Sequence, residues 1–324
     1  MSARARFLAW GRLARLSLAP SALADVAAGL VLGGAGAFPA ARETTLALAA
    51  SACVYHGGMV LNDWADRDED RVARADRPIP SGAIAARTAL LAGLLLVAAS
   101  IALAALVAPR AALWMAGLAA LVVAYDFVGR GPLRGPFLLG ACRAANLGFG
   151  VFVARELGLG YPELEPAFAP LLVALYFVYV ASVSVVARLE DVSSDAAVGN
   201  LPRWALGLAS LVLLSLPCWH ATEGLVVPRW SSLGLAALAA AALLREVARS
   251  GPWTRADAGR ATGLGLRRLL VFSALVALAS VPARGVERDG TQALVSAQTA
   301  LVVAAAILCG FPLSVALRKV FPPT

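Results

Sequence analysis

Acidic side chains gather at two places in this 324-residue sequence, and the spacing of the first group predicts a magnesium site. Segment 61–70 reads LNDWADRDED, so that Asn62, Asp66 and Asp70 are four residues apart, with Asp63 beside them. Residues at i and i+4 share one face of a helix. Carboxylates held so close raise one another's pKa, and a divalent cation relieves their repulsion. A few oxygen ligands, with positions left for phosphate, suit Mg²⁺.

A second acidic cluster, RLEDVSSD, occupies segment 188–195 and again places Asp191 and Asp195 four residues apart. Two such groups facing each other across a cavity would hold two or more Mg²⁺ ions around one diphosphate. The alternative is that both clusters are ordinary solvated loop charges, which is the usual role of a charge run. The regular spacing, and the start of the first cluster inside an apolar segment, favour the metal site.

The elements that must position these residues are membrane helices. Sixty per cent of the residues are hydrophobic, 15% are charged and the mean hydropathy is +0.76, whereas soluble domains are about half apolar and a quarter charged. The apolar residues fall in runs of roughly 18–25, long enough to cross a bilayer. These runs lack the alternation of a membrane barrel, so they must be helices.

We therefore predict an all-α bundle of about nine or ten transmembrane helices around a central cavity. One domain is expected over residues 1–324, in which 1–20 form an amphipathic segment at the cytoplasmic face. The segments 22–40 and 230–248 are the weakest candidates, because both are rich in Ala and Gly. The candidate spans are 22–40, 44–62, 86–107, 110–128, 136–154, 167–188, 203–220, 230–248, 267–283 and 293–317.

The charge distribution orients the bundle. The net charge is +8 and the chain has 28 basic residues, of which only Lys319 is a lysine. Most of them lie in the same alternate loops as the two acidic clusters. Because cytoplasmic loops of membrane proteins are rich in Arg and Lys, we expect a multi-pass protein of the plasma or inner membrane whose acidic loops face the cytoplasm. This explanation of the positive charge also makes nucleic acid an unnecessary partner.

The first cluster resembles the first Asp-rich motif of the UbiA superfamily of intramembrane prenyltransferases, and Asp191 with Asp195 is similar to the second, shorter motif. The segment 77–82 (RPIPSG) is similar to the one that follows the first motif in that family. The resemblance covers roughly residues 20–317. The stretch 140–146 (GACRAAN) resembles the EboC-like branch.

The resemblance implies Mg²⁺-dependent transfer of an isoprenyl group from a prenyl diphosphate to an aromatic or other electron-rich acceptor. The acceptor is not readable from the sequence. The donor, a hydrophobic acceptor and membrane lipids are the expected partners. The residues that match the family's metal and diphosphate positions are Asn62, Asp66, Asp70, Asp191 and Asp195. Asp63 belongs to the same motif and is expected either to bind the metal or to support the residues that do.

Arginine is suited to the diphosphate because its planar guanidinium binds two phosphate oxygens at once. Arg143 is the most informative, because a charge inside a span is either functional or paired structurally, the second alternative being an ion pair with an aspartate of the cavity. Asn146 lies one helical turn further along. The expected catalytic residues are Asp66, Asp191, Arg143 and Tyr125. The expected diphosphate-binding residues are Asn62, Arg67, Arg71, Arg77, Arg130, Arg134 and Asn146.

Tyr125 ends the fourth predicted span and has an electron-rich ring that can stabilise a carbocation. A tyrosine in the membrane interface is the other interpretation. The family often has a basic residue after this tyrosine, and Arg130 or Arg134 would replace it here. The alternative function is a membrane carrier for a lipid or small metabolite, which would favour polar groups in mid-membrane and broken helices. The acidic clusters at the helix ends favour the enzyme.

Overall fold

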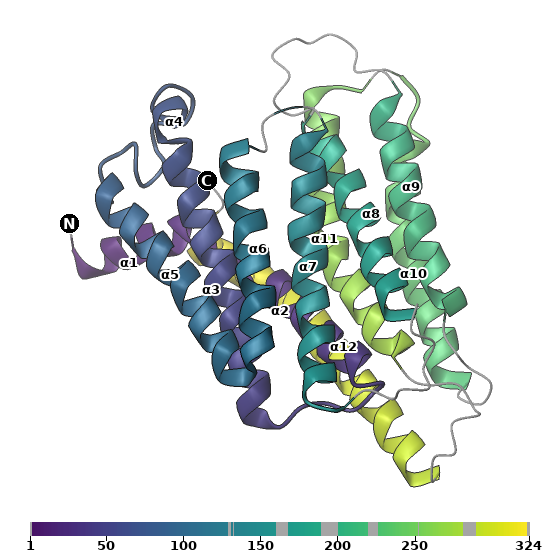
Figure 1. Ribbon diagram of the computed structural model, residues 1–324. Coiled ribbons are helices and arrows are strands. Elements are labelled where there is room, and N and C mark those ends of the chain that lie inside the picture. Colours follow the sequence, from purple (N-terminus) through teal and green to yellow (C-terminus); the bar gives the residue numbers. More distant parts are fainter. Residues whose placement is uncertain are drawn as a thin grey trace.

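The computed structural model describes residues 2–128, 131, 133–159, 168–188, 200–219, 226–251, 253–280 and 290–322. Within these ranges the chain is helical and has no strand, which confirms the predicted all-α fold (Figure 1). The α-helices are α1 Ala3–Leu13, α2 Ala19–Gly33, α3 Ala41–Ala65, α4 Arg67–Ala73, α5 Ala86–Val107, α6 Pro109–Val128, α7 Arg134–Glu156, α8 Phe168–Ala187, α9 Leu201–Ser215, α10 Val226–Val247, α11 Arg255–Ala279 and α12 Gly290–Val320. Two 3₁₀ helices, η1 Leu16–Leu18 and η3 Leu216–Trp219, adjoin α2 and α9.

Ten of the described helical segments are long and apolar enough to cross a bilayer. They include Leu16–Gly33 and Trp230–Val247, so both of the weak candidates form membrane-length helices. The long helices run side by side, whereas α1 lies at a steep angle to them (Figure 1). The chain therefore has the architecture of a multi-pass membrane protein.

The first span ends earlier than predicted. It stops at Gly33 instead of residue 40, because Ala35 and Gly36 take positive φ angles of 50° and 85°. The amide of Gly36 bonds Val31 O at 3.0 Å and the amide of Ala35 bonds Leu32 O at 3.3 Å. This is the hydrogen-bond pattern of a Schellman motif, in which a left-handed residue terminates the helix. The small residues that follow Gly33 are apolar enough for a membrane span, but their backbone conformation ends the helix.

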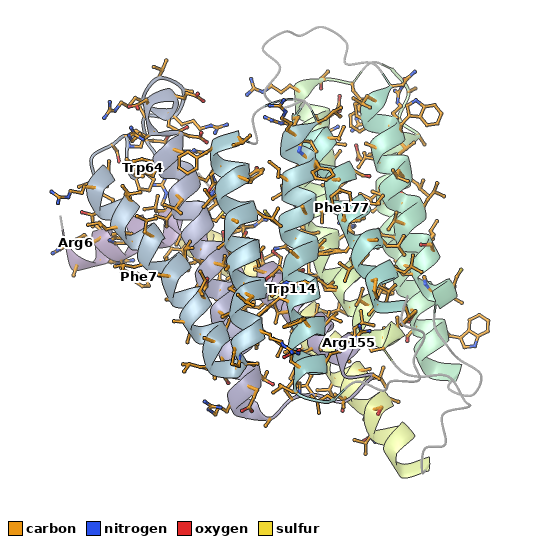
Figure 2. The ribbon with its side chains drawn as sticks, viewed as in Figure 1. Arg6, Phe7, Trp64, Trp114, Arg155 and Phe177 are labelled. Atoms are coloured by element: carbon orange, nitrogen blue, oxygen red, sulfur yellow. The ribbon has the colours of Figure 1, made fainter. Side chains whose placement is uncertain are left out.

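The helices differ in how far they are buried. Windows of α2, α7 and α11 bury about two thirds or more of their residues, whereas those of α5, α6 and α10 bury less than a third. Figure 2 shows apolar side chains along the outer helices. Its Trp114, on α6, donates a hydrogen bond to Ala145 O on α7 at 2.9 Å. The inner helices therefore form the surroundings of any internal site, and the outer ones present apolar surface to lipid.

The N-terminal segment forms α1 and η1 instead of one continuous helix, because Arg15 adopts a left-handed conformation with φ 49°. Leu13 is fully buried in a small apolar cluster with Val60 and Ile79. The segment thus packs on the end of α3, where the first acidic cluster begins.

Glycines bring α2 and α7 into close contact. A Cβ added at Gly150 would lie 2.4 Å from Val26 O and 2.9 Å from Leu30 N, both backbone atoms of α2. Small residues permit such backbone approach in membrane helices. Gly150→Ala is therefore expected to destabilise the protein by about 1–3 kcal/mol through overpacking.

The measurement is thermal unfolding of the detergent-solubilised protein. Gly207→Ala is the matched control, because an added Cβ at Gly207 of α9 meets no atom within 4 Å. Alanine is a better helix former than glycine by about 1 kcal/mol, so this control should melt at the same temperature or higher. Equal destabilisation of the two variants would contradict the close α2–α7 packing.

Candidate active site

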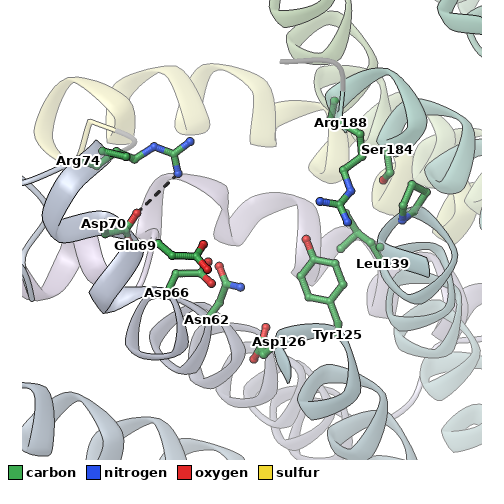
Figure 3. A pocket seen from close by; sticks show the side chains of 14 residues that line it. Asn62, Asp66, Glu69, Asp70, Arg74, Tyr125, Asp126, Leu139, Ser184 and Arg188 are labelled. Atoms are coloured by element: carbon green, nitrogen blue, oxygen red, sulfur yellow. Dashed lines mark ion pairs between the residues drawn. The ribbon is translucent and has the colours of Figure 1, made fainter. Parts of the chain in front are cut away.

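A cavity of about 590 Å³ opens at the end of the bundle that carries α4. In Figure 3, Asn62, Asp66, Glu69 and Asp70 form one side, and Tyr125, Leu139 and Arg188 face them from the other. We call this space the acidic cavity. It is lined by Asn62, Asp66, Glu69, Asp70, Ala73, Arg74, Tyr125, Asp126, Gly135, Pro136, Leu139, Ser184, Ala187 and Arg188.

The four-residue spacing of the first cluster does place three side chains on one wall. Helix α3 ends at Ala65 and α4 begins at Arg67, with Asp66 between them at φ −85° and ψ 0°. The i→i−4 hydrogen bonds nevertheless continue, from Asp66 N to Asn62 O at 3.0 Å and from Asp70 N to Asp66 O at 2.9 Å. The helical register therefore survives the interruption, and Asn62, Asp66 and Asp70 all line the acidic cavity.

Asp63 lies elsewhere. Its Oδ1 accepts a hydrogen bond from Arg15 at 2.9 Å and lies 3.5 Å from Arg77 Nη1. Arg77 also donates to Asp70 Oδ2 at 2.5 Å. All three of Asp63, Asp70 and Arg77 are buried. The structure thus places Asp63 and Arg77 in an ion-pair network behind the acidic cavity and not on its wall.

The ionisation of Arg15 reflects this network. Burial alone would lower the pKa of its guanidinium, but the adjacent Asp63 carboxylate raises it, and the net result is a pKa above the ordinary value. Arg15 therefore stays charged and ties the N-terminal segment to the start of the first cluster.

Three further arginines that were predicted to bind the diphosphate are also absent from the wall of the acidic cavity. Arg67 lies over the Trp64 ring, 4.4 Å from its centroid, and donates to Trp64 O. Arg71 is exposed and pairs with Asp68. Arg134, at the start of α7, is exposed and absent from the cavity wall.

Two basic residues that sequence reasoning did not select, Arg74 and Arg188, line the acidic cavity. Arg188 donates a hydrogen bond to Gly131 O at 2.6 Å. It is the first residue of segment 188–195, which holds the second acidic cluster. Arg130, Asp191 and Asp195 lie outside the described residues, so their predicted roles stay predictions.

Glu69 and Asp126 are further cavity residues that were missed. Asp126 is almost fully buried, hydrogen-bonds to Asn62, and has one carboxylate oxygen without a hydrogen-bond partner. Its position next to Tyr125, at the end of a predicted span, is the feature of the sequence that could have identified it as a cavity residue. Glu69 belongs to the first cluster but lies outside the four-residue spacing that guided the selection.

Arg143 and Asn146 meet deep in the bundle on Asp25 of α2, which is fully buried. Arg143 Nη2 lies 3.1 Å from Asp25 Oδ2, and Asn146 Nδ2 donates to the same oxygen at 3.4 Å. Tyr176 of α8 donates to Asp25 Oδ1 at 2.5 Å, and Ser273 of α11 does so at 3.3 Å. Arg143 thus makes the structural ion pair that was the alternative to a functional role, with an aspartate that is buried on α2 and does not line the acidic cavity.

The acidic cavity offers oxygen donors that fit Mg²⁺: the Asn62 amide and the carboxylates of Asp66, Glu69 and Asp70. Among the described residues, however, no group of three or more His, Cys, Asp or Glu side chains is arranged to hold a metal ion. Mg²⁺ commonly takes one or two carboxylates and completes its coordination with water and substrate phosphates. The cavity therefore fits a metal held jointly with a diphosphate better than a preformed protein cage.

A bundle of membrane-length helices with an acidic cavity at one end defines a class of intramembrane enzyme that handles a charged head group. The sequence model of the UbiA prenyltransferase family matches residues 22–261. The chain therefore belongs to the UbiA prenyltransferase family, and it is an integral, multi-pass membrane prenyltransferase, as predicted.

Relatives agree with this assignment. The digeranylgeranylglyceryl phosphate synthase of Methanopyrus kandleri is 32% identical over 251 residues, which are 71% of this chain and 86% of the relative. The enzyme of the same name from Halobacterium salinarum is 34% identical over 185 residues, which are 56% of this chain and 62% of the relative.

Solved structures agree on the fold. A UbiA homolog from Aeropyrum pernix K1 superposes with a TM-score of 0.60 at 20% identity and covers 81% of this chain and 97% of its own. A UbiA homolog from Archaeoglobus fulgidus, bound to DMAPP and Mg²⁺, gives 0.58 at 18% identity and covers 81% of this chain and 98% of its own.

The ion-pair network behind the cavity makes a prediction about stability. Arg77→Gln leaves the buried carboxylates of Asp63 and Asp70 without their shared cation, and breaking a buried pair in this way costs about 3–5 kcal/mol. Arg71→Gln, which removes an exposed pair with Asp68, is the control and should cost at most about 1 kcal/mol. Thermal unfolding in detergent distinguishes the two, and equal melting temperatures would refute the structural role of Arg77.

Proposed function

We propose that the acidic cavity binds a prenyl diphosphate with Mg²⁺ and transfers its isoprenyl group to an acceptor within the membrane. The observation that carries this proposal is the convergence of Asn62, Asp66 and Asp70 on one wall, opposite Tyr125 and Arg188. Arg188, the first residue of segment 188–195 and the one that the structure describes, lines the same cavity.

Asn62, Asp66 and Asp70 would hold the metal, together with Asp191 and Asp195 if these reach the cavity. Bound Mg²⁺ would neutralise negative charge on the diphosphate leaving group. Arg74 and Arg188 supply positive charge on the same walls, where their guanidinium groups are able to bind phosphate oxygens. The relative from Archaeoglobus fulgidus bound to DMAPP and Mg²⁺ supports this choice of ligand.

In the reaction, the allylic C–O bond of the donor breaks, the diphosphate departs with the bonding electrons, and C1 becomes cationic. The acceptor forms a bond to C1 and releases a proton. Tyr125 lines the acidic cavity and two deeper cavities, so its ring is placed beside the path between head group and interior. An electron-rich ring face stabilises a passing cation, and apolar walls exclude the water that would quench it.

The acceptor class and the membrane orientation belong to this proposal too. The relatives are named for a digeranylgeranylglyceryl phosphate product, so an acceptor hydroxyl joins the aromatic acceptors as a candidate nucleophile.

We place the acidic cavity at the cytoplasmic face, because most of the arginines lie in the loops at this end of the bundle and cytoplasmic loops are rich in Arg and Lys. Mid-membrane polar groups, which a carrier would use, here form the Asp25 network, in which the described donors and acceptors largely bond one another.

Asp66→Ala and Asp191→Ala are each expected to abolish Mg²⁺-dependent diphosphate release from a prenyl diphosphate without unfolding the protein. The loss follows from removing a carboxylate that would share the metal with the diphosphate. The measurement is diphosphate release by purified protein offered labelled prenyl diphosphates of several chain lengths, together with the mass of the prenylated product.

Asp68→Ala is the matched control. Asp68 belongs to the same cluster but is exposed, pairs with Arg67 and Arg71, and is absent from the cavity wall. It should retain release within a few-fold of the wild type. Unchanged release in both Asp66→Ala and Asp191→Ala would overturn the proposed function.

A further inference from the structure

A second cavity, of about 250 Å³, lies deeper in the bundle and adjoins the acidic one. Asn62, Tyr125 and Leu139 line both spaces. We call the second space the arginine cavity, because four arginines line it, from the N-terminal segment, α7, α11 and α12. They are Arg15, Arg143, Arg267 and Arg318.

Among the described residues, the wall of the arginine cavity contains no aspartate or glutamate. Arg15 is paired with Asp63, and Arg143 with Asp25, from behind the wall. Arg267 and Arg318 have no ion-pair or hydrogen-bond partner in the part of the chain that the structure describes. The cavity therefore carries two positive charges beyond those that the described residues neutralise.

The arginines also have unused donors. The Nε atoms of Arg15, Arg143 and Arg318 are buried and make no hydrogen bond. Arg143 is itself only 7% exposed, and its hydrogen bonds all start from Nη2. A buried donor without an acceptor is energetically costly, because it has lost its hydrogen bond to water without gaining another. These unpaired Nε groups destabilise the protein when the cavity holds no ligand. An oxyanion that accepts hydrogen bonds from them would remove this cost, so its binding is favoured.

The remaining wall is largely apolar, with Met59, Val180, Leu269, Leu270 and Phe311 among its members. A ligand that fits both parts has an anionic head and a hydrocarbon body. The acidic cavity repels an unshielded anion, so the head of such a ligand is directed to the arginines and away from the carboxylates of the first cluster.

We propose that the arginine cavity binds the anionic head of the acceptor, and that this acceptor is a lipid phosphate monoester. The assignment rests on the proposed function, because it takes the adjoining acidic cavity as the donor site. Asn62 and Tyr125, shared by both cavities, mark the boundary where the acceptor nucleophile meets C1 of the donor. Arg267 and Arg318 are then specificity-determining residues for the acceptor.

The test is a binding measurement without donor and without metal. The full chain is reconstituted in nanodiscs of neutral lipid with EDTA. Its melting temperature is measured at increasing concentrations of geranylgeranylglyceryl phosphate or of geranylgeranylglycerol, which is the same lipid without the phosphate. Ligand that binds only the folded state raises the melting temperature according to its affinity. We expect the phosphate to bind at least roughly 10-fold more tightly than the alcohol, as one or two charge-assisted hydrogen bonds would give.

The variant is the double substitution Arg267→Gln and Arg318→Gln, which removes the two arginines that have no internal partner and so should leave the fold intact. It is expected to bind phosphate and alcohol about equally. Arg255→Gln is the matched control, because Arg255 is an exposed arginine on α11 outside the cavity wall, and it should keep the preference. Equal binding of both ligands by the wild type, or an unchanged preference in the double variant, would overturn the assignment.

Kinetics separates this proposal from the proposed function. The double variant should raise the KM for the phosphate acceptor about 10-fold or more and leave the KM for the prenyl diphosphate unchanged. A rise confined to the KM for the prenyl diphosphate would show that the two arginines bind the diphosphate of the donor, and would refute the proposal. If wild-type protein shows the binding preference but releases no diphosphate with Mg²⁺, the proposed function fails while the anion site stands.

Discussion

The arrangement of the inner helices depends on one buried carboxylate, that of Asp25. It lies on α2, is fully buried, and receives hydrogen bonds or an ion pair from side chains on α7, α8 and α11. A charge in the low-dielectric interior is tolerated only where it is paired and hydrogen-bonded. The four helices must therefore meet in one rotational setting, because turning any of them by a residue would leave Asp25 or Arg143 without its partner. The same rotational setting positions the Arg143 side chain on the walls of the two deeper cavities.

A similar constraint organises the end of the bundle, where the first acidic cluster divides into two sets of carboxylates. Asp63 and Asp70 bind Arg77, and Asp63 also binds Arg15, so these pairs fasten the N-terminal segment and the loop after α4 to the end of α3. Asp66 and Glu69 line the acidic cavity without belonging to those pairs. Asp70 takes part in both sets. The motif is thus partly a structural clamp and partly the wall of the acidic cavity.

The fold was readable from the sequence because bilayer thickness imposes a minimum length on apolar runs, and all ten runs form membrane-length helices. The shared face of Asn62, Asp66 and Asp70 was also readable, since it follows from helical geometry alone. The separation of Asp63 from them was not, because it depends on Arg15 and Arg77, which the chain path brings together. Arg188 and Arg74 were missed for the same reason: a basic residue near a motif is recognised as cavity-lining only when the neighbouring helices are placed. The early end of α2 was missed because hydropathy does not register a left-handed residue.

The two adjoining cavities have opposite charge, and this opposition has a consequence for a reaction between two anionic substrates. Two such head groups in one site would repel each other, and either would occupy the other's place. Under the two proposals, the carboxylate wall would accept a diphosphate only in company with cations, whereas the arginine wall would accept an oxyanion directly. The distinction does not require the two ligands to differ in shape, since it depends on whether the anion arrives with a metal. The order of charge along the interior runs from Asp66 and Glu69 past Tyr125 to Arg267 and Arg318. If the two proposals hold, this order would by itself direct the donor and the acceptor to different cavities, whatever the structure of their hydrocarbon tails.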